Sequence, residues 1–133
     1  MKDLCIKIKK PDDWHVHLRE TDILTKVLPF TYESFGSALI MPNLERPVTS
    51  IHLAEQYYQE ICRRIPKDVT FTPHMTIYLS NSLNLGDIRK INMHKHIKAV
   101  KMYPKGATTN SESGVSDVLE FYPLFEEMEK TDV

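Results

Sequence analysis

The 133-residue sequence has little cysteine and little glycine, and each shortage excludes a class of protein. The two cysteines, Cys5 and Cys62, form neither a Cys-x-x-Cys pair nor a dense disulfide pattern. We therefore expect reduced thiols with structural roles in a cytoplasmic protein. Only 4 glycines accompany 41% apolar residues, which argues against disorder and favours a single globular domain.

The sequence also lacks an excess of charge and long apolar runs. Its 17 basic and 18 acidic residues give a formal charge of −1, without the basic footprint of a protein that binds nucleic acid or an anionic membrane. No apolar run approaches the roughly 18 residues of a membrane span. Residues 1–10 alternate apolar and polar side chains, which predicts a short strand and is not typical of a signal peptide.

What the sequence does contain is an alternation of strand and helix patterns. Proline and capping residues suggest the limits of several elements: Thr21-Asp22 would begin the first helix and Pro29 would end it, while Thr49 or Ser50 would cap the second. Pro123 would either kink the last helix or open a new one. The expected strands cover residues 14–18, 37–41, 69–79 with an irregular start at Pro73, and 97–103, and the expected helices cover residues 21–28, 50–65, 85–94 and 116–128.

This alternation implies βα units, a parallel sheet and right-handed crossovers. Two architectures fit. An open doubly wound sheet could close on its own at this length, whereas a (β/α)₈ barrel needs about 250 residues, of which four units would be half. In both, ligands bind beyond the carboxyl ends of the strands, and periodicity alone does not choose between them.

The first expected strand carries the clearest chemical motif, Trp14-His15-Val16-His17-Leu18. Side chains two residues apart on a strand leave the same face, with backbones about 6.6 Å apart, so that both imidazoles could reach one metal ion. The preceding acidic pair, Asp12-Asp13, could orient an imidazole from behind. The plainer alternative is a half-buried or exposed histidine pair with no ligand.

Other polar residues follow the remaining strands. Arg19 comes after the first strand, Asn43 after the second, and the loop containing Thr108 and Thr109 after the fourth. Lys101 lies inside the apolar run of residues 99–103, where an unpaired ammonium would be costly to bury. It is either one more solvated lysine or a buried neutral amine available for chemistry.

Three segments together carry a family resemblance. They are Asp13-Trp14-His15-Val16-His17-Leu18-Arg19, Met41-Pro42-Asn43, and Lys101-Met102-Tyr103-Pro104 followed by Ala107-Thr108-Thr109-Asn110-Ser111. In order and spacing they resemble the dihydroorotase family, in its shorter bacterial-type branch of the amidohydrolase superfamily. The resemblance extends over nearly the whole chain.

The resemblance implies a (β/α)₈ barrel of the metallo-dependent hydrolase type, of which residues 1–133 supply the first four units as the N-terminal half of one domain. It implies a Zn²⁺-dependent enzyme that interconverts the small molecules L-dihydroorotate and N-carbamoyl-L-aspartate in de novo pyrimidine biosynthesis. His15 and His17 would bind one zinc, and a carboxylated Lys101 would bridge two. Arg19 and Asn43 would bind the substrate carboxylate, with Thr108 and Thr109 on a mobile loop. The resemblance also implies a homodimer.

In the family, the histidines of the second zinc and the aspartate that acts as general base lie on later strands than these residues provide. His52, His74, His94 and His96 do not match family ligands, and we interpret them as structural or exposed. We therefore expect no catalysis from these 133 residues alone. Two alternatives are a non-catalytic dihydroorotase-like scaffold or truncated copy, and another cyclic-amide hydrolase of the hydantoinase or allantoinase type.

Overall fold

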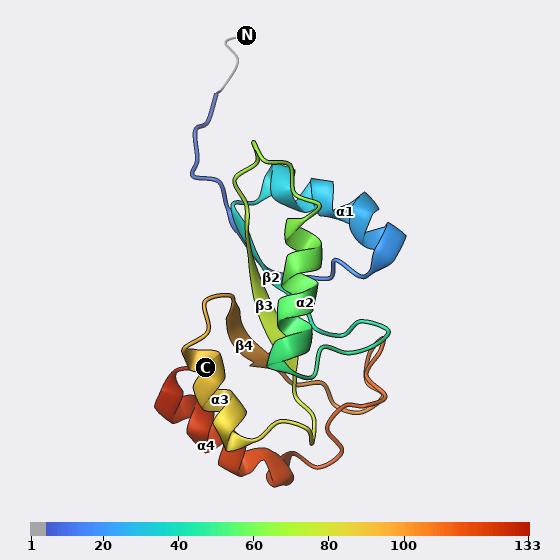
Figure 1. The fold of residues 1–133 in the computed structure, drawn as a ribbon, viewed down its shortest axis with the longest axis vertical. Coiled ribbons are helices and arrows are strands. Elements are labelled where there is room, and N and C mark those ends of the chain that lie inside the picture. Colours follow the sequence, from blue (N-terminus) through green and yellow to red (C-terminus); the bar gives the residue numbers. More distant parts are fainter. Residues whose placement is uncertain (1–4) are drawn as a thin grey trace.

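The computed structural model describes residues 5–133 as a parallel sheet flanked by helices (Figure 1). The four strands lie in the order β1-β2-β3-β4, and every neighbouring pair is parallel. This consecutive order has no reversal point of the kind that defines a doubly wound sheet. The chain therefore forms four consecutive βα units, the strand order found in a (β/α)₈ barrel. The strands are β1 (Asp12–Val16), β2 (Ser37–Ile40), β3 (Thr72–Tyr78) and β4 (Ile97–Lys101).

The helices share one hydrophobic core with one face of the sheet. On the sheet side, Ile40, Ile77 and Ile97 contribute to this core, and all three are almost completely buried. In Figure 1, α2 lies along the sheet, and α3 and α4 lie side by side near β4, in accord with their packing. The helical segments are α1 (Thr21–Ser34), α2 (Ile51–Cys62), α3 (Leu85–Asn92), the 3₁₀ turn η1 (Val118–Phe121) and α4 (Tyr122–Thr131).

The opposite face of the sheet, which we call the inner face, is defined by the strand register. Leu39 pairs with His74, Thr76 with Ala99, and Tyr78 with Lys101. These residues alternate with the core residues and so point away from the helices. Two large apolar side chains of the β1 and β4 segments remain accessible: Trp14 is 64% exposed and Met102 is 42% exposed.

Two predicted features at the start of the chain are wrong. Residues 5–11 form no strand, and Ile6 and Ile8 are exposed; residues 1–4 lie outside the described part of the chain. Helix α1 begins after Glu20 without a side-chain cap, and it continues through Pro29 to Ser34. Since Leu28 and Thr31 on either side of Pro29 are buried, packing on the sheet outweighs the loss of one helical hydrogen bond.

The other helix limits follow local chemistry closely. Pro123 lies in the first turn of α4, which confirms that it opens a new helix after η1. Strand β3 begins at Thr72 with Pro73 as its second residue, in keeping with the predicted late start. Helix α3 begins with a capping box formed by Asn84 and Asp87. Within residues 5–133, no helix combines the length and apolarity needed to cross a membrane.

Replacing Ser50 with alanine is expected to destabilise the chain by about 1 kcal/mol, because its side chain accepts a hydrogen bond from the backbone N–H of Leu53 at 3.2 Å and caps α2. Urea unfolding followed by circular dichroism measures the loss. The neighbouring Thr49→Ala variant is the control, since Thr49 contributes only its backbone carbonyl, to Ser82. Equal losses in the two variants would contradict the cap.

Candidate functional site

A bulge in β1 determines how the histidine pair is presented. The register passes from Asp13↔Ala38 to Val16↔Ile40, so that Trp14 and His15 together oppose one residue of β2. The carboxylate of Asp13 accepts a hydrogen bond at 2.9 Å from the backbone N–H of His15, inside the bulge. Asp12 accepts one at 2.7 Å from the hydroxyl of Ser37. The prediction that these carboxylates orient an imidazole is therefore wrong: Asp13 binds the backbone of the bulge, and Asp12 binds the side chain of Ser37.

The two imidazoles converge beyond the end of β1. Their Nε2 atoms are 3.3 Å apart, and the ring planes are inclined by 47°. Two nitrogens that are each about 2.0–2.1 Å from one tetrahedral Zn²⁺ lie roughly 3.3–3.4 Å apart, so this spacing suits a shared metal ion. Burial lowers the pKa of His17, and the nearby charges of Arg19, His15 and Lys101 lower it further, against the opposing effect of the Asn43 side chain. A lowered pKa favours the neutral imidazole, the form that binds metals.

Arg19 is held in place by contacts on both its main chain and its side chain. Its φ of 59° lies in the left-handed region, which is uncommon for a residue with a long side chain. The hydroxyl of Tyr57, on helix α2, donates a 2.7 Å hydrogen bond to the Arg19 carbonyl and stabilises this backbone conformation. The guanidinium lies 3.5 Å from the backbone carbonyl of Asn43. Arg19 is thereby brought beside the segment that follows β2.

Asn43 is the most connected polar residue of the site, and it is only 1% exposed. Its Oδ1 atom accepts a 2.8 Å hydrogen bond from the hydroxyl of Tyr103, and its Nδ2 atom donates a 3.0 Å bond to the carbonyl of Thr109. The side-chain amide of Asn110 donates at 3.3 Å to the Asn43 carbonyl. Asn43 therefore joins the end of β2 to the segment that follows β4.

That segment, residues 104–115, is called the β4 loop below. The side chains of Thr108 and Thr109 are exposed, whereas Ser111 is fully buried, and its hydroxyl closes a turn by bonding to both the backbone N–H and the carbonyl of Thr108. The base of the loop is tight at Gly114, where an added Cβ would lie 2.5 Å from the carbonyl oxygen of Tyr103. The loop is thus closed at its base and docked on Asn43 near its tip.

Lys101 lies at the end of β4 on the inner face and is half-buried. Its Nζ atom is 5.5 Å from the centre of the Tyr103 ring, in a cation–π arrangement. Among residues 5–133, no group of three or more His, Cys, Asp or Glu side chains could hold a metal ion. Any metal at this rim would have only His15 and His17 as ligands of those four types from the described residues.

Tyr103 was missed as a site residue by sequence reasoning. It is buried, its ring stacks on that of Tyr78 with centroids 5.1 Å apart, and burial raises its pKa to about 12, with Tyr78 adding to this effect and Arg19 opposing it. The available signal was its position two residues after Lys101, because that spacing places both side chains on one face of an extended chain.

The remaining histidines lie elsewhere. His52 is exposed, His74 stacks on Trp14, His94 is 3.1 Å from the carboxylate of Glu55, and His96 stacks on Tyr58. His74 and His96 line a cavity at the amino end of β3, opposite the candidate site. Both cysteines are free; Cys62 is half-buried, whereas Cys5 is exposed, which does not support the structural role expected for Cys5.

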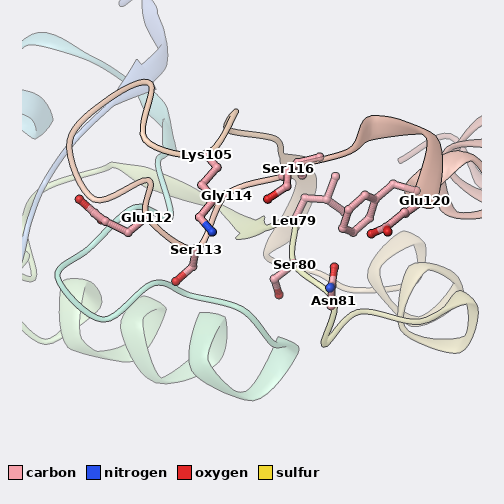
Figure 2. A pocket seen from close by; sticks show the side chains of 11 residues that line it. Leu79, Ser80, Asn81, Lys105, Glu112, Ser113, Gly114, Ser116 and Glu120 are labelled. Carbon is pink, nitrogen blue, oxygen red and sulfur yellow. The ribbon is translucent and has the colours of Figure 1, made fainter.

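A cavity of about 300 Å³ lies beside the candidate site and includes none of its predicted residues (Figure 2). Ser80 and Asn81, after β3, line one part of it, and the β4 loop, η1 and the segment between them line the rest. It contains both a base, Lys105, and two acids, Glu112 and Glu120. This mixed lining gives no preference for a ligand of one charge.

The sequence of the chain is similar to those of known proteins. No family profile matches the chain. A curated dihydroorotase of Serratia proteamaculans is 48% identical over 125 residues, and one of Yersinia enterocolitica is 46% identical over 125 residues. The chain is similar to the N-terminal part of dihydroorotases. These alignments cover 94% of the chain but 36% of each relative, so the chain spans about a third of the length of the curated dihydroorotases it matches.

Solved dihydroorotase structures agree with the fold. A Saccharomyces cerevisiae dihydroorotase in complex with 5-fluoroorotic acid superimposes with a TM-score of 0.83 at 35% identity, over 92% of this chain and 34% of that one. A Campylobacter jejuni dihydroorotase superimposes with a TM-score of 0.85 at 33% identity, over 93% of this chain and 36% of that one. The four βα units therefore have the dihydroorotase arrangement.

Proposed function

We propose that residues 1–133 form the N-terminal half of a dihydroorotase barrel and supply one side of its active site. The proposed reaction is the reversible hydrolysis of L-dihydroorotate to N-carbamoyl-L-aspartate, in de novo pyrimidine biosynthesis. The observation that carries the proposal is the 3.3 Å approach of the His15 and His17 Nε2 atoms on a rim that also holds Arg19, Asn43 and Lys101. The homodimeric state and cytoplasmic location implied by the resemblance belong to the same proposal.

The donor set fits zinc. Two imidazoles with converging Nε2 atoms are suitable ligands, and addition of carbon dioxide to the deprotonated amine of Lys101, with loss of a proton, would give a carbamate with two oxygen ligands. That change would also remove the cost of holding an ammonium in a half-buried position beside two metal ions. Bound zinc would act as a Lewis acid on the carbonyl of the amide being hydrolysed. His15, His17 and Lys101 are the residues of this chain that would hold it.

Arg19 and Asn43 are suited to the substrate carboxylate. A guanidinium offers a planar fork of N–H donors to a carboxylate, and the Nδ2 atom of Asn43 adds a further donor on the same rim. The 5-fluoroorotic acid bound by the yeast relative is itself a ring carboxylate. The β4 loop, which carries Thr108 and Thr109, would cover the bound substrate and exclude water.

The proposal predicts that this chain can replace the matching part of an active relative. We would substitute it for the corresponding 125 residues of the Serratia proteamaculans dihydroorotase, giving a protein called the hybrid enzyme below. The expected result is hydrolysis of dihydroorotate, with about two zinc ions per chain by metal analysis. Hydantoin and allantoin serve as competing substrates.

Preferential hydrolysis of hydantoin or allantoin would assign a different cyclic-amide hydrolase. A folded hybrid enzyme that binds zinc but hydrolyses none of the three would favour a non-catalytic scaffold. As a matched negative control, the His15→Ala/His17→Ala hybrid should lose both zinc and activity. The chain of 133 residues alone is expected to be inactive in the same assay.

A further inference from the structure

We infer that Tyr103 is a positioning residue: its hydroxyl fixes the side-chain amide of Asn43 in the orientation that both anchors the β4 loop and presents an N–H donor to the substrate carboxylate. Only the second part of this inference, the N–H donor presented to the substrate carboxylate, rests on the proposed function. The first half concerns contacts within residues 43–111 and can be tested without any reaction.

The hydrogen-bond directions in this cluster are consistent with one orientation of the amide. The carbonyl of Thr109 can only accept, so the atom of Asn43 that faces it at 3.0 Å must be the donating Nδ2. The atom that faces the hydroxyl of Tyr103 at 2.8 Å is then Oδ1, which can only accept, and the phenol must donate. Rotating the amide by half a turn would place two acceptors together at Thr109. The Thr109 carbonyl therefore selects this orientation, and the hydrogen bond from the Tyr103 hydroxyl to Oδ1 stabilises it.

Contacts of both its backbone and its ring fix the position of Tyr103. Its backbone carbonyl accepts a 2.8 Å hydrogen bond from Val115 at the base of the β4 loop, and its ring stacks on Tyr78. The side-chain amide of Asn43, in contrast, is oriented by its hydrogen bonds to Tyr103 and Thr109. Removing the phenol oxygen leaves the ring in place and releases only the amide.

The chain supplies a matched control for that change. Tyr78 is buried against the same ring, yet its hydroxyl has no hydrogen-bond partner within residues 5–133. Tyr78→Phe and Tyr103→Phe therefore remove the same atom from neighbouring rings of the same stack. Only the second removes a bond to Asn43.

In the chain of 133 residues, hydrogen–deuterium exchange of peptides from residues 105–114 measures how firmly the β4 loop is docked. Tyr103→Phe is expected to speed this exchange about three- to tenfold, the equivalent of one hydrogen bond, while Tyr78→Phe leaves it unchanged. An Asn43→Leu variant should speed it at least as much. Adding Tyr103→Phe to Asn43→Leu should then have no further effect, because the two residues act as one unit.

In the hybrid enzyme, Tyr103→Phe is expected to raise KM for dihydroorotate about three- to tenfold, with kcat and zinc content nearly unchanged. Tyr78→Phe should change neither constant. Equal exchange or equal KM in the two Phe variants, or additive effects of Tyr103→Phe and Asn43→Leu, would overturn the inference. If the parent hybrid enzyme is inactive but the exchange pattern holds, the loop anchor stands and the proposed function fails.

Discussion

Replacing Lys101 with alanine in the hybrid enzyme is expected to abolish hydrolysis of dihydroorotate and to reduce zinc from about two ions per chain to one or none. The loss should exceed the roughly 10–100-fold that follows removal of a residue supporting a metal ligand, because Lys101 would be a ligand itself. Steady-state kinetics and metal analysis on the same preparation check both expectations. No other residue of β4 should have an effect of this size.

Lys98 provides the comparison within the same strand. Lys98 is an exposed lysine of β4, and it does not lie on the inner face with Ala99 and Lys101. Lys98→Ala removes the same charge from the protein without touching the rim, and it should leave kcat, KM and zinc content close to those of the parent. If Lys101→Ala matched the parent in both activity and zinc, the carbamate assignment would be wrong and Lys101 would be an ordinary solvated lysine.

Truncating Ile77 to alanine is expected to destabilise the chain of 133 residues by about 2–5 kcal/mol, which is a large fraction of the total stability of a typical domain. Ile77 is 0% exposed in β3, at the centre of the core shared by the sheet and the helices. The loss combines buried apolar area with the cavity left by three missing carbon atoms. Urea unfolding monitored by circular dichroism measures it.

A graded pair of variants makes that expectation specific. Ile77→Val removes a single carbon and should cost about 0.5–1.5 kcal/mol, so its transition should remain measurable. Met93→Ala removes a side chain that is largely exposed, and it should change stability by less than about 0.5 kcal/mol. Similar losses for Ile77→Val and Ile77→Ala would mean that this face of β3 is not the packed core.

The order of strands and helices could be predicted from the sequence because burial imposes a period on each element. Core residues form the apolar runs of β2 and β4, and they recur at helical spacing in α2. The predicted start of α1 at Thr21 is confirmed, although Thr21 does not cap the helix, and the predicted end at Pro29 is wrong for a related reason. Pro29 and Thr21 are local signals, and local preferences of about 1–3 kcal/mol yield when neighbouring residues such as Leu24 and Leu28 are buried against the sheet.

The strand predicted over residues 1–10 shows the limit of periodicity. Alternation favours a strand only when another strand is available to pair with it, and Ile6 and Ile8 contact no strand in the described residues. In Figure 1, residues 5–10 extend away from the sheet. An alternating pattern indicates which residues could share a face of a strand. It does not indicate whether a second strand is available to pair with that segment.

The candidate site was predicted residue by residue for His15, His17, Arg19, Asn43, Lys101, Thr108 and Thr109, and their chemical roles stay predictions. What sequence could not supply was the network that joins them. The bonds of Tyr103 and Asn110 to Asn43 link residues more than 55 positions apart, so no local spacing indicates them. The bulge that gathers the two imidazoles also depends on pairing with β2.

The hydrogen bond from Tyr57 to the carbonyl of Arg19 links two parts of the protein that are usually discussed separately. Tyr57 belongs to the outer layer of helices, whereas Arg19 belongs to the rim, and the bond allows an arginine backbone to stay in the left-handed region. The rim that is proposed to bind the substrate carboxylate is thus held in part by a helix of the outer layer. A change in α2 that removes this bond is therefore expected to alter both the stability of the chain and the position of Arg19.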